Sequence, residues 1–150
     1  MNIAIVSSSF RKEVSENLEK NCLKTLKEKG IKDSQIKLFK VPGSWEIPLL
    51  VKKLAKSKKY DAIITFGAIV KGDTYHFEQI ANELSRALMQ ICLEFEIPVI
   101  FEGLAVYDLK DALKRATRIK ENEQRSSGEQ NKGIEAALTA LEMIKIIKNT

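Results

Sequence analysis

The chain has 150 residues, 44% of them hydrophobic, with a formal net charge of +5, two cysteines and one histidine. This length suits one domain, residues 1–150, that can bury a core of its own. No apolar run approaches the roughly 18 residues that predict a membrane span. The N-terminal "MNIAIVSSSF" lacks the basic region and cleavage site of a secretory signal, so we expect a cytoplasmic protein. One histidine and two scattered cysteines do not favour a zinc site.

The excess of positive charge does not by itself predict a nucleic-acid-binding protein. The lysines lie mostly on helix faces mixed with glutamates, and the densest cluster, "KKLAKSKKY" (52–60), has a single aromatic residue at its end. Nucleic-acid-binding domains usually combine a basic stripe with a recognisable motif. We therefore expect solvated helix faces and an overall charge that suits small anionic substrates.

Four strand patterns alternate with helical patterns along the chain. The strands are expected at residues 2–7, 36–41, 61–67 and 98–104, and three of them are nearly continuous apolar runs, as in parallel strands buried on both faces. Repeated β–α units with right-handed crossovers predict a three-layer α/β fold, in which a four-stranded parallel sheet is flanked by helices on both faces. The expected apolar helix stripes are Val14, Leu18, Cys22 and Leu26; Phe77, Ile80, Ala81, Leu84, Leu88, Ile91 and Phe95; Leu109, Ala112, Leu113 and Ala116; and Ile134, Ala137, Leu138, Leu141 and Ile144.

A polar stretch, "KENEQRSSGEQNKG" (120–133), separates the last two helical patterns. Ser126, Ser127 and Gly128 interrupt any helix there. The stretch predicts an insertion or a kink between two C-terminal helices.

Ligands bind open parallel sheets beyond the carboxyl ends of the strands. The first strand leads into "SSSFRKE", where residues 7–9 are expected to cap the following helix. Phe10 then stands just past the strand, where it can stack on a planar ligand or tuck under its own helix.

The second strand leads into "VPGSWEIP". Its Pro-Gly turn makes Ser44 a plausible helix N-cap and places Trp45 and Glu46 at the mouth of the sheet. A carboxylate beside backbone amides can bind a polyhydroxylated or heterocyclic ligand. Equally, Glu46 can be a first-turn acid favoured by the helix dipole.

The third strand leads into "GAIVKGDTYHFEQIANE" (67–83), which contains the only histidine. Gly67 and Gly72 allow the backbone to approach a ligand closely. Asp73 and Thr74 are expected to begin a helix whose free N–H groups form an anion site. His76 lies in the first turn beside that site, where it can transfer protons near neutral pH or serve only as a structural residue.

The fourth strand leads into "FEGLAVYD" and a helix that carries Arg115. An arginine can bind phosphate through two parallel hydrogen bonds. An arginine on a helix can also simply face solvent.

These segments together resemble the lumazine synthase family of riboflavin biosynthesis. The matching pieces are "VPGSWEIP", "GAIVKGDTYHFE", "PVIF", "ALKRA" and "NKGIEAALTALEM", in family order and at family spacing over nearly the whole chain. The second of these is highly specific and the first fairly specific. The resemblance implies a flavodoxin-like fold and an enzyme that needs no cofactor and no metal. It would condense 5-amino-6-(D-ribitylamino)uracil with 3,4-dihydroxy-2-butanone 4-phosphate to 6,7-dimethyl-8-ribityllumazine, with release of phosphate and water.

The resemblance also implies a role for each matching residue. His76 would transfer protons, Asp73 and Thr74 would bind the substrate phosphate, and Arg115 would clamp the same phosphate. An aromatic from a neighbouring subunit, Phe101, would complete an active site between subunits. The pyrimidine substrate and its ribityl chain would contact Phe10, Ser44, Trp45, Glu46, Ala68, Ile69 and Val70.

The implied assembly is a homopentamer, and riboflavin synthase is a candidate partner.

The chain departs from many members by Glu102 in place of a glycine, by Lys71 in place of the commoner arginine, and by a longer stretch at 117–133. That stretch is charged and contains Ser-Ser-Gly, so burying it between rings would be costly. We therefore expect a free pentamer, or at most a pair of rings, rather than an icosahedral shell.

Two other functions are compatible with parts of the sequence. A flavodoxin-like binding module could hold a flavin, a lumazine or a nucleotide without turnover, and a basic domain could bind RNA. The set Phe10, Glu46, Thr74, His76 and Arg115 favours the enzyme, because a binding module would not need His76.

Overall fold

The computed structural model describes residues 1–117 and 131–150, so residues 120–130 of the predicted insertion or kink lie outside the described residues. The strands are β1 (Ile3–Ser8), β2 (Ile36–Val41), β3 (Ala62–Val70) and β4 (Val99–Val106). The helices are α1 (Lys12–Glu28), α2 (Ile47–Lys56), α3 (His76–Phe95), α4 (Leu109–Ala116) and α5 (Lys132–Lys148), with short 3-10 turns at Asp33–Gln35 and Ser44–Glu46.

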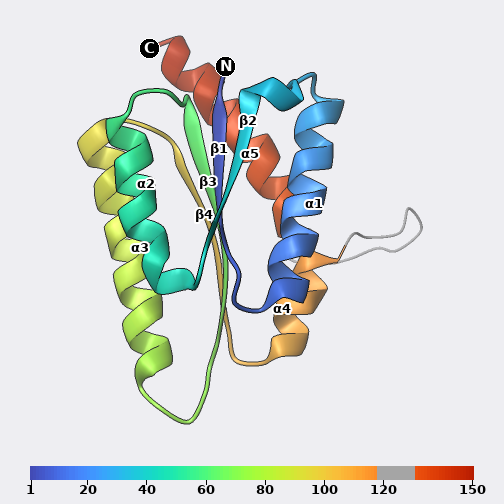
Figure 1. Ribbon diagram of the computed structural model, residues 1–150, viewed down its shortest axis with the longest axis vertical. Coiled ribbons are helices and arrows are strands. Elements are labelled where there is room, and N and C mark those ends of the chain that lie inside the picture. Colours follow the sequence, from blue (N-terminus) through green and yellow to red (C-terminus); the bar gives the residue numbers. More distant parts are fainter. Residues whose placement is uncertain (118–130) are drawn as a thin grey trace.

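The strands form one parallel sheet in the order β2-β1-β3-β4. Helices α2 and α3 cover one face of the sheet, while α1, α4 and α5 cover the other (Figure 1). The predicted three-layer, flavodoxin-like α/β fold is therefore confirmed.

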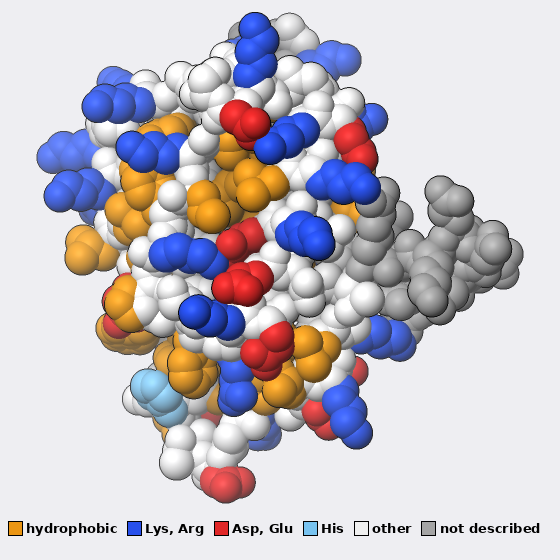
Figure 2. Space-filling view, turned by 45° about the vertical axis from the view of Figure 1, so that its right-hand side comes forward, with side chains coloured by type: hydrophobic (Ala, Val, Ile, Leu, Met, Phe, Trp, Pro, Cys, Tyr) orange, Lys and Arg blue, Asp and Glu red, His pale blue; other side chains and the backbone are white. Residues whose placement is uncertain are grey.

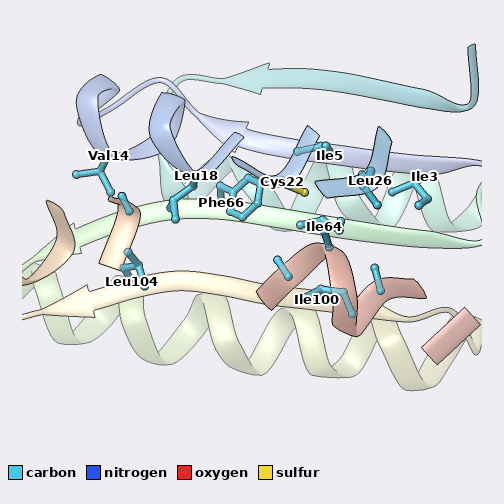
Figure 3. Close-up of a cluster of buried hydrophobic side chains, with 14 of the residues drawn as sticks. Ile3, Ile5, Val14, Leu18, Cys22, Leu26, Ile64, Phe66, Ile100 and Leu104 are labelled. Carbon is cyan, nitrogen blue, oxygen red and sulfur yellow. The ribbon is translucent and has the colours of Figure 1, made fainter. Parts of the chain in front are cut away.

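Each face of the sheet has its own apolar cluster, because successive strand residues point to opposite faces. Ile64 and Phe66 of β3 pack with α1 on one side, whereas Ile63 and Ile69 pack on the α2–α3 side. Figure 3 shows the first cluster, in which the α1 stripe Val14, Leu18, Cys22 and Leu26 faces β1 and β3 as predicted.

Helix α5 buries most of the stripe that we expected, since Ala137 and Ile144 are buried and Leu141 packs against the core, but Leu138 is not part of the buried face. Leu138 is 43% exposed, while Ala136 and Ala140 are fully buried. A Cβ atom on Gly133 would lie 2.2 Å from the backbone oxygen of Leu18 in α1. Small residues therefore let α5 pack closely on α1, and Leu138 lies outside that contact.

Strand β3 is longer than the predicted 61–67. It pairs with β1 only as far as Ser7–Phe66, but with β4 as far as Val70–Val106. The strand does not end at Gly67 because β4 continues beside it. One edge of residues 68–70 thus extends past the end of β1.

On the face shown in Figure 2, the described charged side chains do not form a single basic stripe. Basic side chains are spread over the face in Figure 2, with acidic side chains between several of them. No helix in the described part of the chain is both long and apolar enough to cross a membrane. Within residues 1–117 and 131–150, no cluster of His, Cys, Asp and Glu side chains is suited to hold a metal ion.

Glu102 is an unusual residue on β4. It is half-buried and faces Lys132 and Glu135 in the first turn of α5. Burial raises the pKa of the Glu102 carboxyl to about 7, because desolvation and the nearby Glu135 charge outweigh the attraction of Lys132. Lys132 is itself paired with Glu135 at 2.8 Å.

We predict that Glu102 makes the protein less stable as the pH rises. The unfolded chain releases this proton near the ordinary value of 4.5, whereas the folded chain keeps it up to about 7. Stability linked to Glu102 is therefore full below pH 4.5 and is lost as the pH rises through about 7. Glu102→Gln should raise the urea midpoint at pH 8 and leave it nearly unchanged at pH 4. Glu142→Gln, an exposed change on α5, should have little effect at either pH. A Glu102→Gln protein that unfolds like the wild type at pH 8 would contradict the prediction.

Candidate active site

The loop after β1 presents an exposed aromatic ring. The Ser8 hydroxyl accepts a hydrogen bond from the Phe10 N–H at 3.2 Å, and Ser9 N–H donates to the Val41 oxygen of β2 at 2.8 Å. Arg11 adopts a left-handed conformation, and its guanidinium lies 5.3 Å from the centroid of the Phe10 ring. Phe10 is 62% exposed, so it does not tuck under its own helix.

The predicted capping of α1 by residues 7–9 is wrong. Arg11 occupies the N-cap position, and no side chain there caps the helix. Ser7 instead donates its hydroxyl hydrogen to the buried Glu19 carboxylate, which Lys40 also contacts. This network joins β1, α1 and β2 behind the Phe10 loop.

The loop after β2 is seated on β3. Ser44 is buried, and a Cβ atom on Gly67 would lie 2.7 Å from the Ser44 hydroxyl oxygen. Gly43, not Ser44, occupies the N-cap position of the 3-10 turn Ser44–Glu46, so the predicted N-cap role of Ser44 is wrong. Tight packing on glycine fixes Ser44 and leaves Trp45, 59% exposed, at the mouth of the sheet.

The free edge of β3 faces the space between these two loops. Ala68, Ile69 and Val70 line a cavity of about 470 Å³ together with the Phe10 and Ser44–Glu46 segments. On their other edge the same residues pair with β4. Their outer backbone groups lie beyond the end of β1 and can donate and accept hydrogen bonds in the cavity.

The loop after β3 closes the cavity. Helix α3 begins at His76, later than the predicted start at Asp73, so Thr74 lies in the preceding turn. Thr74 and His76 line the cavity and Asp73 does not. No side chain caps the N-terminus of α3, so its first N–H groups are available to bind an anion. His76 is exposed at this end of the molecule.

Lys71 points away from the cavity. Its Nζ lies 5.3 Å from the centroid of the Tyr107 ring and 3.9 Å from Glu78 Oε1. Its N–H donates to the Val106 oxygen at 2.9 Å. Lys71 therefore ties the β3–α3 loop to the end of β4.

Two predicted site residues lie outside the cavity. Arg115 is on α4, on the opposite face of the sheet from α3, and its Nη1 donates to the Asp111 oxygen at 3.0 Å. Phe101 is on β4, 40% exposed, with its ring over Gly103, where an added Cβ would lie 2.3 Å from the ring. Within one chain, the cavity thus brings together Phe10, Ser44, Trp45, Glu46, Ala68, Ile69, Val70, Thr74 and His76, without Asp73, Phe101 or Arg115.

Several residues that line the cavity were not predicted to do so from the sequence. Phe77 and Ile80 line the cavity, although their spacing on α3 indicated only a core stripe. Gly43 and Arg11 also line it, and so does Gly72, where the sequence already predicted a close approach of the backbone to a ligand. Arg11 had no sequence signal, because its place depends on the left-handed backbone that turns it back over Phe10.

Comparison with known proteins agrees with the motifs. The chain has low similarity to a de novo designed Rossmann fold protein, at 16% identity over 75% of this chain and 91% of that chain, with a TM-score of 0.42. The model of the 6,7-dimethyl-8-ribityllumazine synthase family matches residues 1–148. The match spans every described strand and helix, including the three loops that form the cavity. The chain belongs to the 6,7-dimethyl-8-ribityllumazine synthase family, and hence to the enzymes of riboflavin biosynthesis.

Proposed function

We propose that the cavity catalyses the condensation of 5-amino-6-(D-ribitylamino)uracil with 3,4-dihydroxy-2-butanone 4-phosphate. The observation that carries this proposal is the convergence of the Phe10 loop, the Ser44–Glu46 turn, the free edge of β3 and His76 on one cavity of about 470 Å³. The family membership supplies the reaction class. The local geometry supports a place for each substrate.

The pyrimidine would lie along the free edge of β3. A planar heterocycle there can exchange hydrogen bonds with backbone groups of residues 68–70, much as another strand would. The exposed ring of Phe10 can stack on its face. The Glu46 carboxylate can accept hydrogen bonds from ribityl hydroxyls, since it lines the same cavity.

The butanone phosphate would bind at the start of α3. Thr74 supplies a hydroxyl, and the first-turn N–H groups of α3 favour an anion. Arg115 would provide the charge-assisted bonds by exchanging its contact with Asp111 for one with the phosphate. Asp73, in the same loop, would shape this subsite through its backbone.

His76 would move the protons of the reaction. The substrate amine attacks the ketone and forms an imine with loss of one water, phosphate leaves, the intermediate isomerises, and the ring closes with loss of a second water. Each of these steps moves a proton, and an imidazole at the cavity can accept and donate protons near neutral pH. Holding the two substrates together can itself be worth on the order of 7–11 kcal/mol.

A second subunit would complete the site. Phe101 does not line the cavity of its own chain and is partly exposed on the edge strand β4. A neighbour's Phe101 could cover the open side of the pyrimidine. Large exposed apolar side chains on α2 and α3, such as Leu49 at 79% and Leu93 at 70% exposure, would provide a surface for contact between subunits.

A flavin- or lumazine-binding module without turnover is the alternative. It would use the same stacking ring and the same strand edge. It would have no use for His76 at the start of α3, so catalysis and binding can be separated at that residue.

We predict that His76→Ala and His76→Gln lower product formation by about 10²–10⁴-fold, because general acid–base catalysis is lost. The condensation is chemically feasible without a catalyst, so some activity should remain. The assay mixes both substrates with protein and follows lumazine absorbance and released phosphate. Tyr75→Phe, an exposed neighbour, should behave as the wild type. Undiminished turnover in both His76 variants would refute the assignment, and no turnover by the wild type would favour the binding module.

We predict that Arg115→Ala weakens the butanone phosphate selectively. Losing a hydrogen bond to a charged group costs about 1.5–3 kcal/mol, which corresponds to a rise of roughly 10- to 150-fold in KM for that substrate. The KM for the pyrimidine should change little. Lys110→Ala, an exposed change on the same helix, serves as the control. Equal weakening of both substrates would contradict this role.

We predict that the protein in solution is a homopentamer, or at most a pair of rings, rather than a shell. Light scattering should give five or ten times the chain mass of 16.9 kDa. The charged stretch that prompted this expectation lies mainly outside the described residues, so the mass is the direct test. A much larger, shell-sized particle would overturn the prediction, and a monomer would also contradict the proposed site between subunits.

A further inference from the structure

The carboxyl end of α4 is held by a side chain from another helix. Helix α4 spans only Leu109–Ala116, and the carbonyls of its last turn have no partners within the helix. The Asn131 side-chain Nδ2 donates to the Ala116 oxygen at 2.6 Å. Asn131 is 1% exposed, so this hydrogen bond is shielded from water.

The same side chain caps α5. Asn131 Oδ1 accepts hydrogen bonds from the N–H groups of Gly133 at 2.9 Å and Ile134 at 3.1 Å. One amide thus uses its oxygen for α5 and its nitrogen for α4. The bond joins the two sides of residues 118–130, so it aligns the helices independently of that segment.

The start of α5, where Asn131 lies, is packed tightly against α1. Gly133 follows Asn131 closely, and a Cβ atom there would lie 2.2 Å from the Leu18 backbone oxygen in α1. Helix α5 therefore cannot slide along α1 without losing this close contact. The position of Asn131 is thereby set by the contact between α5 and α1.

The hydrogen bond from Asn131 ends beside Arg115, the residue proposed to bind the substrate phosphate. Arg115 directly precedes Ala116, whose carbonyl Asn131 holds. A helix of this length has little stability of its own, so its orientation depends on tertiary contacts. Ala112 and Ala116 are fully buried, and Leu109 and Leu113 pack partly buried against the same core. These apolar contacts hold the inner side of the helix, and the bond to Asn131 adds a directed contact at its carboxyl end.

We propose that Asn131 is a positioning residue for Arg115: its amide nitrogen fixes the end of α4 and thereby the place from which the guanidinium reaches phosphate. This inference rests on the proposed function in assigning Arg115 to the phosphate. Capping of α5 alone would explain the oxygen of Asn131. It would not explain the nitrogen, and this difference makes the two roles separable.

The test uses two variants that keep the cap and remove the donor. Asn, Asp and Ser are about equally good N-caps. Both Asn131→Asp and Asn131→Ser keep an oxygen that can cap α5. The Asp carboxylate has no donor for the Ala116 carbonyl, and Ser replaces the amide donor by a single shorter hydroxyl that is used at the cap. We expect KM for the butanone phosphate to rise by on the order of 10- to 100-fold in both variants, since small misplacements of a binding group can cost that much. KM for the pyrimidine should change less than about two-fold. Leu141→Ala, which removes core packing from the same helix, should lower the unfolding midpoint without this split.

Two further measurements separate the outcomes. In the Arg115→Ala background, Asn131→Ser should add nothing to KM for the phosphate substrate, because both changes act on one group. Hydrogen exchange of the α4 amides should be at least about tenfold faster in Asn131→Ser, whatever Arg115 binds. Wild-type exchange in α4, or wild-type KM in both cap-preserving variants while Arg115→Ala is impaired, would overturn the inference. If Arg115→Ala leaves KM for the butanone phosphate unchanged, the phosphate role of Arg115 is refuted. Hydrogen exchange of the α4 amides would then be the test of whether Asn131 holds the end of α4.

Discussion

The unequal length of two neighbouring strands is the constraint on which the candidate site depends. β1 stops pairing with β3 at Ser7–Phe66, while β4 accompanies β3 to Val70. Three residues of β3 are thus supported on one edge and open on the other. Only because that edge is unpaired can the Phe10 loop and the Ser44–Glu46 turn come together around it and leave a cavity. A longer β1 would fill the site with another strand.

The loops around this edge are held by packing rather than by helix caps. Ser44 lies against Gly67, the Glu19 carboxylate joins Ser7 to Lys40, and Lys71 is drawn to Tyr107. Ser7 and Glu19 are buried, and buried polar groups are costly unless they are paired. Their pairing, like the exposed Lys71–Tyr107 contact, links neighbouring elements at their ends. The exposed rings of Phe10 and Trp45 are therefore presented by backbone that is itself well supported.

Sequence patterns predicted the layers and most of the residues that line the cavity, because both depend on local signals. Apolar runs and helical stripes report burial directly, and the family motifs name residues one by one. The missed features are non-local. The end of β3 depends on the length of β4, the burial of Ala140 over Leu138 depends on how closely α1 approaches, and Arg11 depends on a left-handed turn. None of these has a signature within a short window of sequence.

The proposed chemistry also depends on non-local contacts. The cavity belongs to the layer of α2 and α3, whereas Arg115 belongs to the layer of α1, α4 and α5 on the other side of the sheet (Figure 1). No single loop can set the distance between His76 and Arg115. It follows from the sheet between them, from the Lys71–Val106 bond at its edge, and from the way α4 is fastened to α5. The contacts of Asn131 and Gly133 lie within the layer of α1, α4 and α5, so these residues would act on the proposed clamp by setting where α4 sits in its own layer.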